Sequence, residues 1–210
     1  MFAKSIMIPK HRCVVVSVDD SVETALNLLE TRGIDCLPVL NGDEYAGVIT
    51  HYHIYKNFYE SNLSKGEFLQ SKKVKDVATH QEKYLKGNEI FEETLVELKD
   101  FPLLSVVDEQ NIFLGIVTRF DVLEQFQSAF GVHKPGVRIA FSSVEVEGRI
   151  SRLADIIGQF HESVISLVTF DETDKLVRRI VLKIEKRDNI DKFVSKLESS
   201  GFRILHIVED

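Results

Sequence analysis

Two short stretches of the sequence pair a hydroxyl with a second polar side chain at the same spacing. GVITHYHI runs from Gly47 to Ile54, and GIVTRFDV runs from Gly115 to Val122. Each contains a glycine, two branched aliphatic residues, a threonine, and a polar residue three positions after that threonine. This last residue is an aspartate in the second stretch and a histidine in the first. The sequence therefore predicts two related sites, only one of which carries a carboxylate.

The pair Thr118 and Asp121 has the chemistry of a contact to a phosphorylated sugar. We expect Thr118 at the end of a strand and Asp121 in the first turn of the next helix, where free backbone N–H groups favour phosphate. The threonine hydroxyl can bond phosphate or ribose, and a carboxylate can accept bonds from both cis hydroxyls of a ribose. Arg119 is the nearest cation and is expected to face the phosphate. The alternative is that Thr118 only caps the helix and Asp121 only complements its dipole.

The histidine of the first stretch predicts an altered site. His53 cannot accept two hydroxyl protons as a carboxylate does, but it can donate to phosphate when protonated or stack on a base. His51 and His53 also form a His-x-His pair. Two ligands do not complete a tetrahedral metal site, so no metal is predicted there.

These stretches end a longer internal repeat. Gly47 and Gly115 are 68 residues apart, as are Thr50 and Thr118. The pattern of apolar and turn residues predicts the same order of elements in residues 14–54 and 83–123. This order is a strand, a helix, a strand–turn–strand hairpin and the start of another helix. Asp19 or Ser21 can cap the first helix, which Gly33 ends. One such unit is too small to close a core alone, whereas two stacked units can.

The C-terminal segment has a different pattern. Strands are expected at 137–144, 164–170, 175–185 and 202–208, with a turn at 171–174 and amphipathic helices at 148–160 and 189–201. The order β-α-β-β-α-β is that of the ferredoxin-like split βαβ motif. Its last strand leaves an edge or an open sheet face where a second copy can dock.

Composition limits the class of protein. The chain has 210 residues, a formal net charge of −7 and two cysteines, Cys13 and Cys36, which we expect to be reduced core thiols. No apolar run is long enough to span a membrane, and no secretory signal is seen, so a cytoplasmic protein is expected. The acidic balance argues against a nucleic-acid or membrane surface. Phosphate-loop, nucleophile-elbow and zinc-protease motifs are missing, so we expect no catalytic residues, cofactor or enzyme activity.

The repeated unit resembles the CBS domain, and the C-terminal segment is similar to an ACT domain. The first resemblance rests on IDCLPVL with GVITHYHI and on FPLLSVVD with GIVTRFDV, and the second on element order and a turn glycine, Gly148. The whole arrangement resembles acetoin-utilisation AcuB-type and related bacterial CBS–ACT regulators. The resemblance implies an α/β (α+β) fold, a tandem CBS pair (Bateman module) followed by a ferredoxin-like βαββαβ ACT domain. The expected boundaries are 1–60 for the first repeat, 61–73 for a connector, 74–130 for the second repeat, 131–136 for a linker and 137–210 for the ACT domain.

By the same resemblance, each site lies across the two repeats. Thr118, Arg119 and Asp121 would face Ile34, Asp35, Cys36 and Leu37, whose backbone would read an adenine edge while Ile34 and Leu37 pack its ring; Ser17 is a further candidate. The second, weaker site would combine Thr50 and His53 with Phe101, Pro102 and Leu103.

The function implied is that of a non-catalytic regulator. Its CBS pair would bind an adenine-containing nucleotide (AMP, ATP or cyclic di-AMP) and signal to a partner protein. Two alternatives stay open: a small-effector or amino-acid sensor acting through Gly148 and Arg149, and an assembly module without a ligand. A homodimer is expected in each case, because the helices after Thr50 and Thr118 carry many aromatic and aliphatic side chains. They are Tyr52, Tyr55, Phe58 and Tyr59 in one repeat and Phe120, Leu123, Phe126 and Phe130 in the other.

Overall fold

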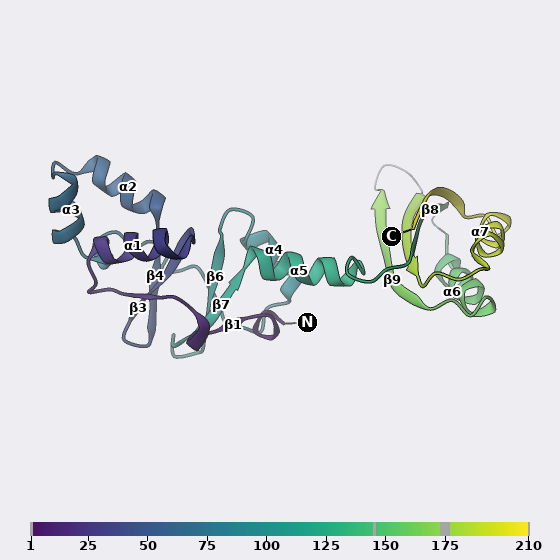
Figure 1. The fold of residues 1–210 in the computed structure, drawn as a ribbon. Coiled ribbons are helices and arrows are strands. Elements are labelled where there is room, and N and C mark those ends of the chain that lie inside the picture. The colour runs from purple at the N-terminus through teal and green to yellow at the C-terminus, as the bar shows by residue number, and fades with distance from the viewer. Residues whose placement is uncertain (1, 145, 173–176, 210) are drawn as a thin grey trace. The chain divides into compact units, whose positions relative to one another are not determined.

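The chain forms two compact units, residues 1–123 and 124–210. The computed structural model describes residues 2–144, 146–172 and 177–209, and Figure 1 shows its course. In the first unit the elements are β1 (Ile8–Pro9), β2 (Val16–Ser17), α1 (Val22–Arg32), β3 (Cys36–Asn41), β4 (Glu44–Thr50), α2 (His51–Glu60), α3 (Lys65–Ser71), β5 (Tyr84–Leu85), α4 (Phe91–Glu97), β6 (Leu103–Val107) and β7 (Phe113–Thr118). The helix α5 (Arg119–Ala129) begins in the first unit and continues into the second.

The two repeats have the element order that the sequence predicted. In each, a short strand pairs in parallel with the first strand of an antiparallel hairpin, as β2 does with β3 and β5 with β6. The two hairpins also share one register, because Cys36 pairs with Thr50 and Leu103 pairs with Thr118. The helix α1 begins where the Ser21 side chain accepts a hydrogen bond from Thr24 N, and it ends at Gly33 in the left-handed conformation. Ser21, rather than Asp19, is therefore the cap.

The two repeats exchange their leading segments. The strand β1, which precedes the first repeat, pairs with β7 of the second repeat. In the same way Thr79, which precedes β5, forms an antiparallel bridge with Val48 of β4. Each sheet is thereby extended by chain that leads into the other repeat. This exchange is what the linear order of the repeats did not reveal.

Two of the apolar clusters formed by described residues of the first unit bear on the site. One lies under α1 and includes Leu29, Leu37 and Ile49 together with Phe68 of α3. The other joins the hairpins of the two repeats and is formed by Cys36, Leu40, Tyr45, Val48, Leu103, Val107 and Phe113. Because this second cluster is built from residues of both repeats, a single repeat lacks part of it, in line with the expectation that one repeat cannot close a core alone.

The second unit has the predicted ferredoxin-like order of elements. They are β8 (Val137–Val144), α6 (Arg149–Gln159), β9 (Val164–Glu172), β10 (Val177–Ile184), α7 (Ile190–Ser199) and β11 (Arg203–Glu209). The sheet order is β11-β8-β10-β9, with every pairing antiparallel. Both α6 and α7 pack on one face of this sheet, where Phe141, Leu153, Ile180 and Phe193 are fully buried (Figure 1). The strand β11 lies at an edge, as expected; the predicted turn at 171–174 lies partly outside the described residues.

Candidate functional site

Thr118 and Asp121 are bonded to each other at the junction of β7 and α5. The Asp121 carboxylate accepts from the Thr118 backbone N at 2.8 Å and from Thr118 Oγ1 at 2.5 Å, and Thr118 Oγ1 accepts from Asp121 N at 3.2 Å. This is the reciprocal pattern of a capping box, which satisfies donors at the helix start. Both bonds to the carboxylate use Oδ2, and within the described residues no hydrogen bond reaches Oδ1. The pair thus caps α5, and the second carboxylate oxygen remains for another donor.

A cavity of about 380 Å³ opens beside this junction. Thr118 lines it together with Ile34 and Asp35, which precede β3, and with Cys36, the first residue of β3; the sequence predicts these four residues for one site. Pro102 and Leu103, which were assigned to the second site, line the same cavity. The reason is the common hairpin register, since Cys36 and Leu103 occupy corresponding positions at the starts of β3 and β6.

The lining residues that sequence reasoning missed include three consecutive ones, Arg12, Cys13 and Val14. They belong to the segment between β1 and β2, which the pairing of β1 with β7 carries to this edge of the second repeat. Their only signal in the sequence was their place ahead of the first repeat. Arg12 gives the cavity lining a cation, a role for which the sequence predicts Arg119.

Arg119 itself has other partners. Its guanidinium donates to the backbone carbonyls of Leu98, Lys99 and Phe101 at 3.1–3.3 Å. A cation at the end of α4 satisfies carbonyls that the helix leaves open. The residue is therefore bonded to the α4–β6 turn and is absent from the cavity lining.

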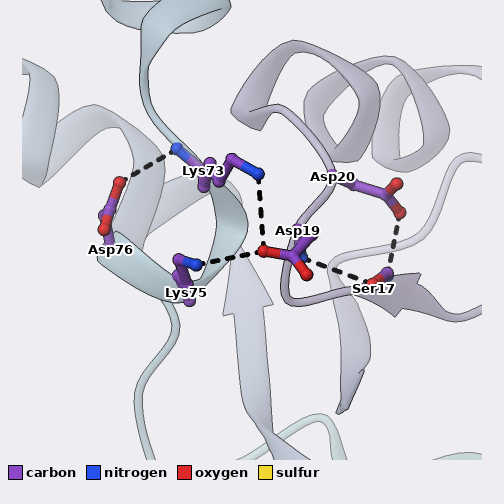
Figure 2. A network of polar contacts seen from close by, with 6 residues as sticks. All are labelled: Ser17, Asp19, Asp20, Lys73, Lys75 and Asp76. Atoms are coloured by element: carbon purple, nitrogen blue, oxygen red, sulfur yellow. Dashed lines mark hydrogen bonds and ion pairs between the residues drawn. The ribbon is translucent and has the colours of Figure 1, made fainter. Parts of the chain in front are cut away.

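Leu37 and Ser17 lie outside the cavity lining as well. Side chains of a strand alternate between its two faces, so Cys36 faces the cavity while Leu37 is fully buried in the cluster under α1. The backbone N of Ser17 donates to Asp20, and its hydroxyl accepts from Asp19 N. Figure 2 shows this turn, with the Asp19 carboxylate held by Lys73 and Lys75 at 3.4 and 3.0 Å.

The cavity wall holds both cysteines as neutral thiols. Burial raises the pKa of Cys36 to about 12. Burial also raises the pKa of Cys13, where the nearby Arg12 acts to lower it and Asp121 to raise it. Arg12 lines the cavity, whereas Asp121 does not and is connected to it through its hydrogen bonds with the lining residue Thr118.

The corresponding residues of the first repeat form a different cluster. Thr50 caps α2 by accepting from His53 N at 3.2 Å, and the His53 ring lies 3.1 Å from Thr79 Oγ1 at its Nε2. The rings of His53 and Phe101 both pack on His80, with centroids 5.6 and 4.4 Å away. His53 and Phe101, both predicted for the second site, thus contact the same ring of His80, which was not predicted. Among the described residues, no group of three or more potential ligands is placed to hold a metal ion.

The glycine of each signature has a steric role. A Cβ on Gly115 would lie 2.1 Å from the Ile8 carbonyl oxygen, and a Cβ on Gly47 would lie 2.6 Å from the Thr79 carbonyl oxygen. Both contacts are with the exchanged leading segment of the other repeat. A side chain at either glycine would push away the segment that forms one wall of the adjoining site.

In the second unit, a cavity of about 440 Å³ is lined by Gly148 and Arg149 among others. Gly148 has a left-handed backbone ahead of α6. The Arg149 guanidinium donates to Ser143 Oγ, Ser200 O and Gly201 O at 2.6–3.0 Å. Arg149 therefore ties the end of β8 to the turn before β11, in addition to lining the cavity.

The family model for the CBS domain matches residues 3–60 and 74–128, more than half of the chain. The chain therefore belongs to the CBS domain family and carries a tandem pair of CBS domains. None of the described helices is both long and apolar enough to cross a membrane.

Known proteins are similar over different shares of the chain. Inosine-5'-monophosphate dehydrogenase of Methanocaldococcus jannaschii is 27% identical over 196 residues, 91% of this chain and 35% of that protein. The chain thus spans about a third of that relative's length. The structure of Listeria monocytogenes CbpB in complex with c-di-AMP has 29% identity and a TM-score of 0.52, and it covers 58% of this chain and 91% of that one. CBSX2 in complex with AMP has 27% identity and a TM-score of 0.51, with 60% and 95% covered.

Proposed function

We propose that this protein is a non-catalytic regulator whose CBS pair binds an adenine-containing nucleotide. The observation that carries the proposal is the cavity of about 380 Å³ that joins Ile34–Cys36 to Thr118 and holds Arg12. An apolar cavity with a few convergent polar groups is the usual form of a small-molecule site. The c-di-AMP and AMP complexes of the two CBS relatives support the choice of ligand class.

Each part of the ligand would contact different residues: those that line the cavity and Asp121, which is bonded to the lining residue Thr118. The base would lie against Ile34 and the backbone of Asp35 and Cys36, where main-chain N–H and C=O groups can read an adenine edge. The ribose hydroxyls would bond Thr118 Oγ1 and the open Oδ1 of Asp121. The phosphate would meet Arg12, whose guanidinium suits an oxyanion.

Signalling would be by population shift, because a ligand that favours one arrangement of the CBS pair changes what a partner protein meets. Asp121 lies in the first turn of α5, the helix that continues into the second unit. A bond from ribose to Asp121 would therefore act at the start of that helix.

The test is calorimetry with AMP, ATP and cyclic di-AMP on the wild-type chain and two pairs of variants. Asp121→Asn should weaken binding by at least about tenfold, since a charge-assisted hydrogen bond contributes about 1.5–3 kcal/mol. Glu124→Gln, an exposed change one turn further along α5, should have no effect.

Two arginine variants test which arginine contacts the phosphate: Arg12, which lines the cavity, or Arg119, which the sequence predicts. Arg12→Gln should weaken AMP binding but leave adenosine binding unchanged, because only AMP carries the phosphate. Arg119→Gln should not weaken AMP binding by contact, since its partners are carbonyls of the α4–β6 turn. Lack of binding by all three nucleotides would reject the proposal and favour a ligand-free assembly module.

A second candidate function belongs to the C-terminal unit. We propose that it is an ACT domain, on the ferredoxin-like order of its elements and the cavity of about 440 Å³ at Gly148. A small effector such as an amino acid would bind there. Calorimetry with an amino-acid set tests this separately from the nucleotides, and Gly148→Ala should remove any such signal, since its φ of +84° disfavours a side chain.

A further inference from the structure

A group of basic side chains converges in the first unit away from the Thr118 cavity. His53 of α2 and His80, in the segment before β5, have ring centroids 5.6 Å apart at an interplanar angle of 44°. The His80 ring packs edge-on against Phe101 at 4.4 Å, and Lys83 Nζ lies 4.7 Å from the centroid of that same Phe101 ring. All four side chains are half-buried. Two imidazoles and one ammonium group thus meet beside one aromatic ring.

The charges that surround these rings are mostly positive. Lys56, one turn along α2, acts electrostatically on His53. Glu82 is the counter-charge, with Oε1 3.6 Å from His80 Nδ1. With neutral rings, Lys56 and Lys83 against Glu82 leave a net charge of +1, and protonation of both rings brings it to +3. Tyr52 and Thr79, which also contact His53, carry no charge at neutral pH.

We propose that His53 and His80 form an acid-dependent oxyanion site, which binds a phosphate group when both rings are protonated. Two rings at this separation can each donate to the same anion, because a charge-assisted N–H···O bond needs about 2.7–2.9 Å between nitrogen and oxygen. Lys83 adds a third cation at the Phe101 side. The backbone N–H of His53 donates to Thr50 Oγ1, so the donors offered to the anion are the two imidazole rings and Lys83.

The site differs in chemistry from the Thr118 cavity. There, Asp121 offers a carboxylate for sugar hydroxyls; here, the corresponding residue is a donor of positive charge. The second repeat would therefore supply a ribose contact at any pH near neutrality, and the first repeat a phosphate contact only in acid. The inference does not depend on nucleotide binding at the Thr118 cavity.

Sulfate is the probe, because it stays a dianion across the range in which histidine titrates. Thermal unfolding of the full chain is followed at about pH 5.5 and about pH 7.5, on either side of the ordinary histidine pKa near 6.5. Sodium sulfate is compared with sodium chloride at equal ionic strength, which removes general screening. His51→Gln is the matched control, because His51 lies on the same helix but stacks on Tyr55 instead of His80.

We expect sulfate to raise the unfolding midpoint of the wild type and of His51→Gln more at the acid pH. This extra rise should be lost in both His53→Gln and His80→Gln. In NMR titrations, sulfate should raise the pKa of both ring protons in the wild type. Equal protection at both pH values, or an acid-dependent rise that survives in either glutamine variant, overturns the site.

The source of the anion is resolved by a second arm in the double variant Arg12→Gln/Asp121→Asn, which weakens both the phosphate and the ribose contact proposed at the Thr118 cavity. Tighter acid-dependent binding of AMP than of sulfate, with no binding of adenosine, would identify a nucleotide phosphate. Equal binding of AMP and sulfate would identify a free oxyanion. Failure of the sulfate arm rejects this site alone, whereas failure of nucleotide binding in the wild type at neutral pH rejects the proposed function alone.

Discussion

Replacement of Gly115 by alanine tests the exchange of leading segments between the repeats. The new Cβ would lie 2.1 Å from the Ile8 carbonyl oxygen and 2.8 Å from Met7 Cγ. The Met7 side chain can move, but the Ile8 carbonyl is backbone within β1, which pairs with β7 at this point. Either β1 separates from β7 or the hairpin of the second repeat shifts.

The expected cost follows from both effects. Overpacking costs about 1–3 kcal/mol, and each backbone hydrogen bond lost from the β1–β7 pair costs about 1 kcal/mol. We therefore expect Gly115→Ala to lower the free energy of unfolding of the first unit by roughly 2–4 kcal/mol. Ile8 also lines the Thr118 cavity, so the folded variant should bind nucleotide more weakly.

Urea denaturation followed by circular dichroism measures the change, and the chain has no tryptophan to serve as a fluorescent probe. The matched control is Gly66→Ala in α3, where a Cβ would meet nothing within 4 Å. Alanine has the higher helix propensity, so this variant should be more stable by up to about 1 kcal/mol. If Gly115→Ala is as stable as the wild type, the close approach of β1 to β7 is wrong and so is the steric role of the glycine.

Three further predictions concern charge and surface. Burial, together with the charges of His80 and Lys56, lowers the pKa of His53 from 6.5, so the unfolded chain binds more protons at this residue than the folded chain does. The free energy of unfolding should therefore fall as the pH drops below about 6.5. Melting midpoints measured in chloride over a series of pH values should fall less steeply in His53→Gln than in the wild type. The buried Lys183 donates to the Gly131 carbonyl at 3.0 Å, so Lys183→Met should destabilise the second unit by about 1–3 kcal/mol in urea denaturation; a neutral result would show that the bond contributes nothing. The residues Tyr52 and Phe120 are 68% and 72% exposed, so light scattering should give twice the chain mass of 24.0 kDa. A variant with serine at both positions should shift the mass toward one chain, and a monomeric wild type contradicts the dimer.

Much of the local structure followed from the sequence. The repeat, its hairpins, the Gly33 stop of α1 and the β-α-β-β-α-β order of the second unit all rest on periodicity and turn chemistry. The bonds between Thr118 and Asp121 are local as well, since three residues separate a helix cap from its partner. Signals of this kind survive in a single sequence because the atoms that interact are close along the chain.

The composition of the site was settled by tertiary structure. Arg12 and Cys13 reach the cavity because β1 pairs with β7, more than a hundred residues later in the chain. Arg119 lies next to Thr118 in sequence, yet its guanidinium bonds carbonyls at the end of α4. His80 lies between His53 and Phe101 for the same kind of reason, through the pairing of Thr79 with Val48. Sequence motifs specify which side chains have suitable chemistry, whereas long-range strand pairing decides which of them lie in one site. That pairing joins segments far apart in the chain, and neither segment carries a sequence pattern that identifies its partner.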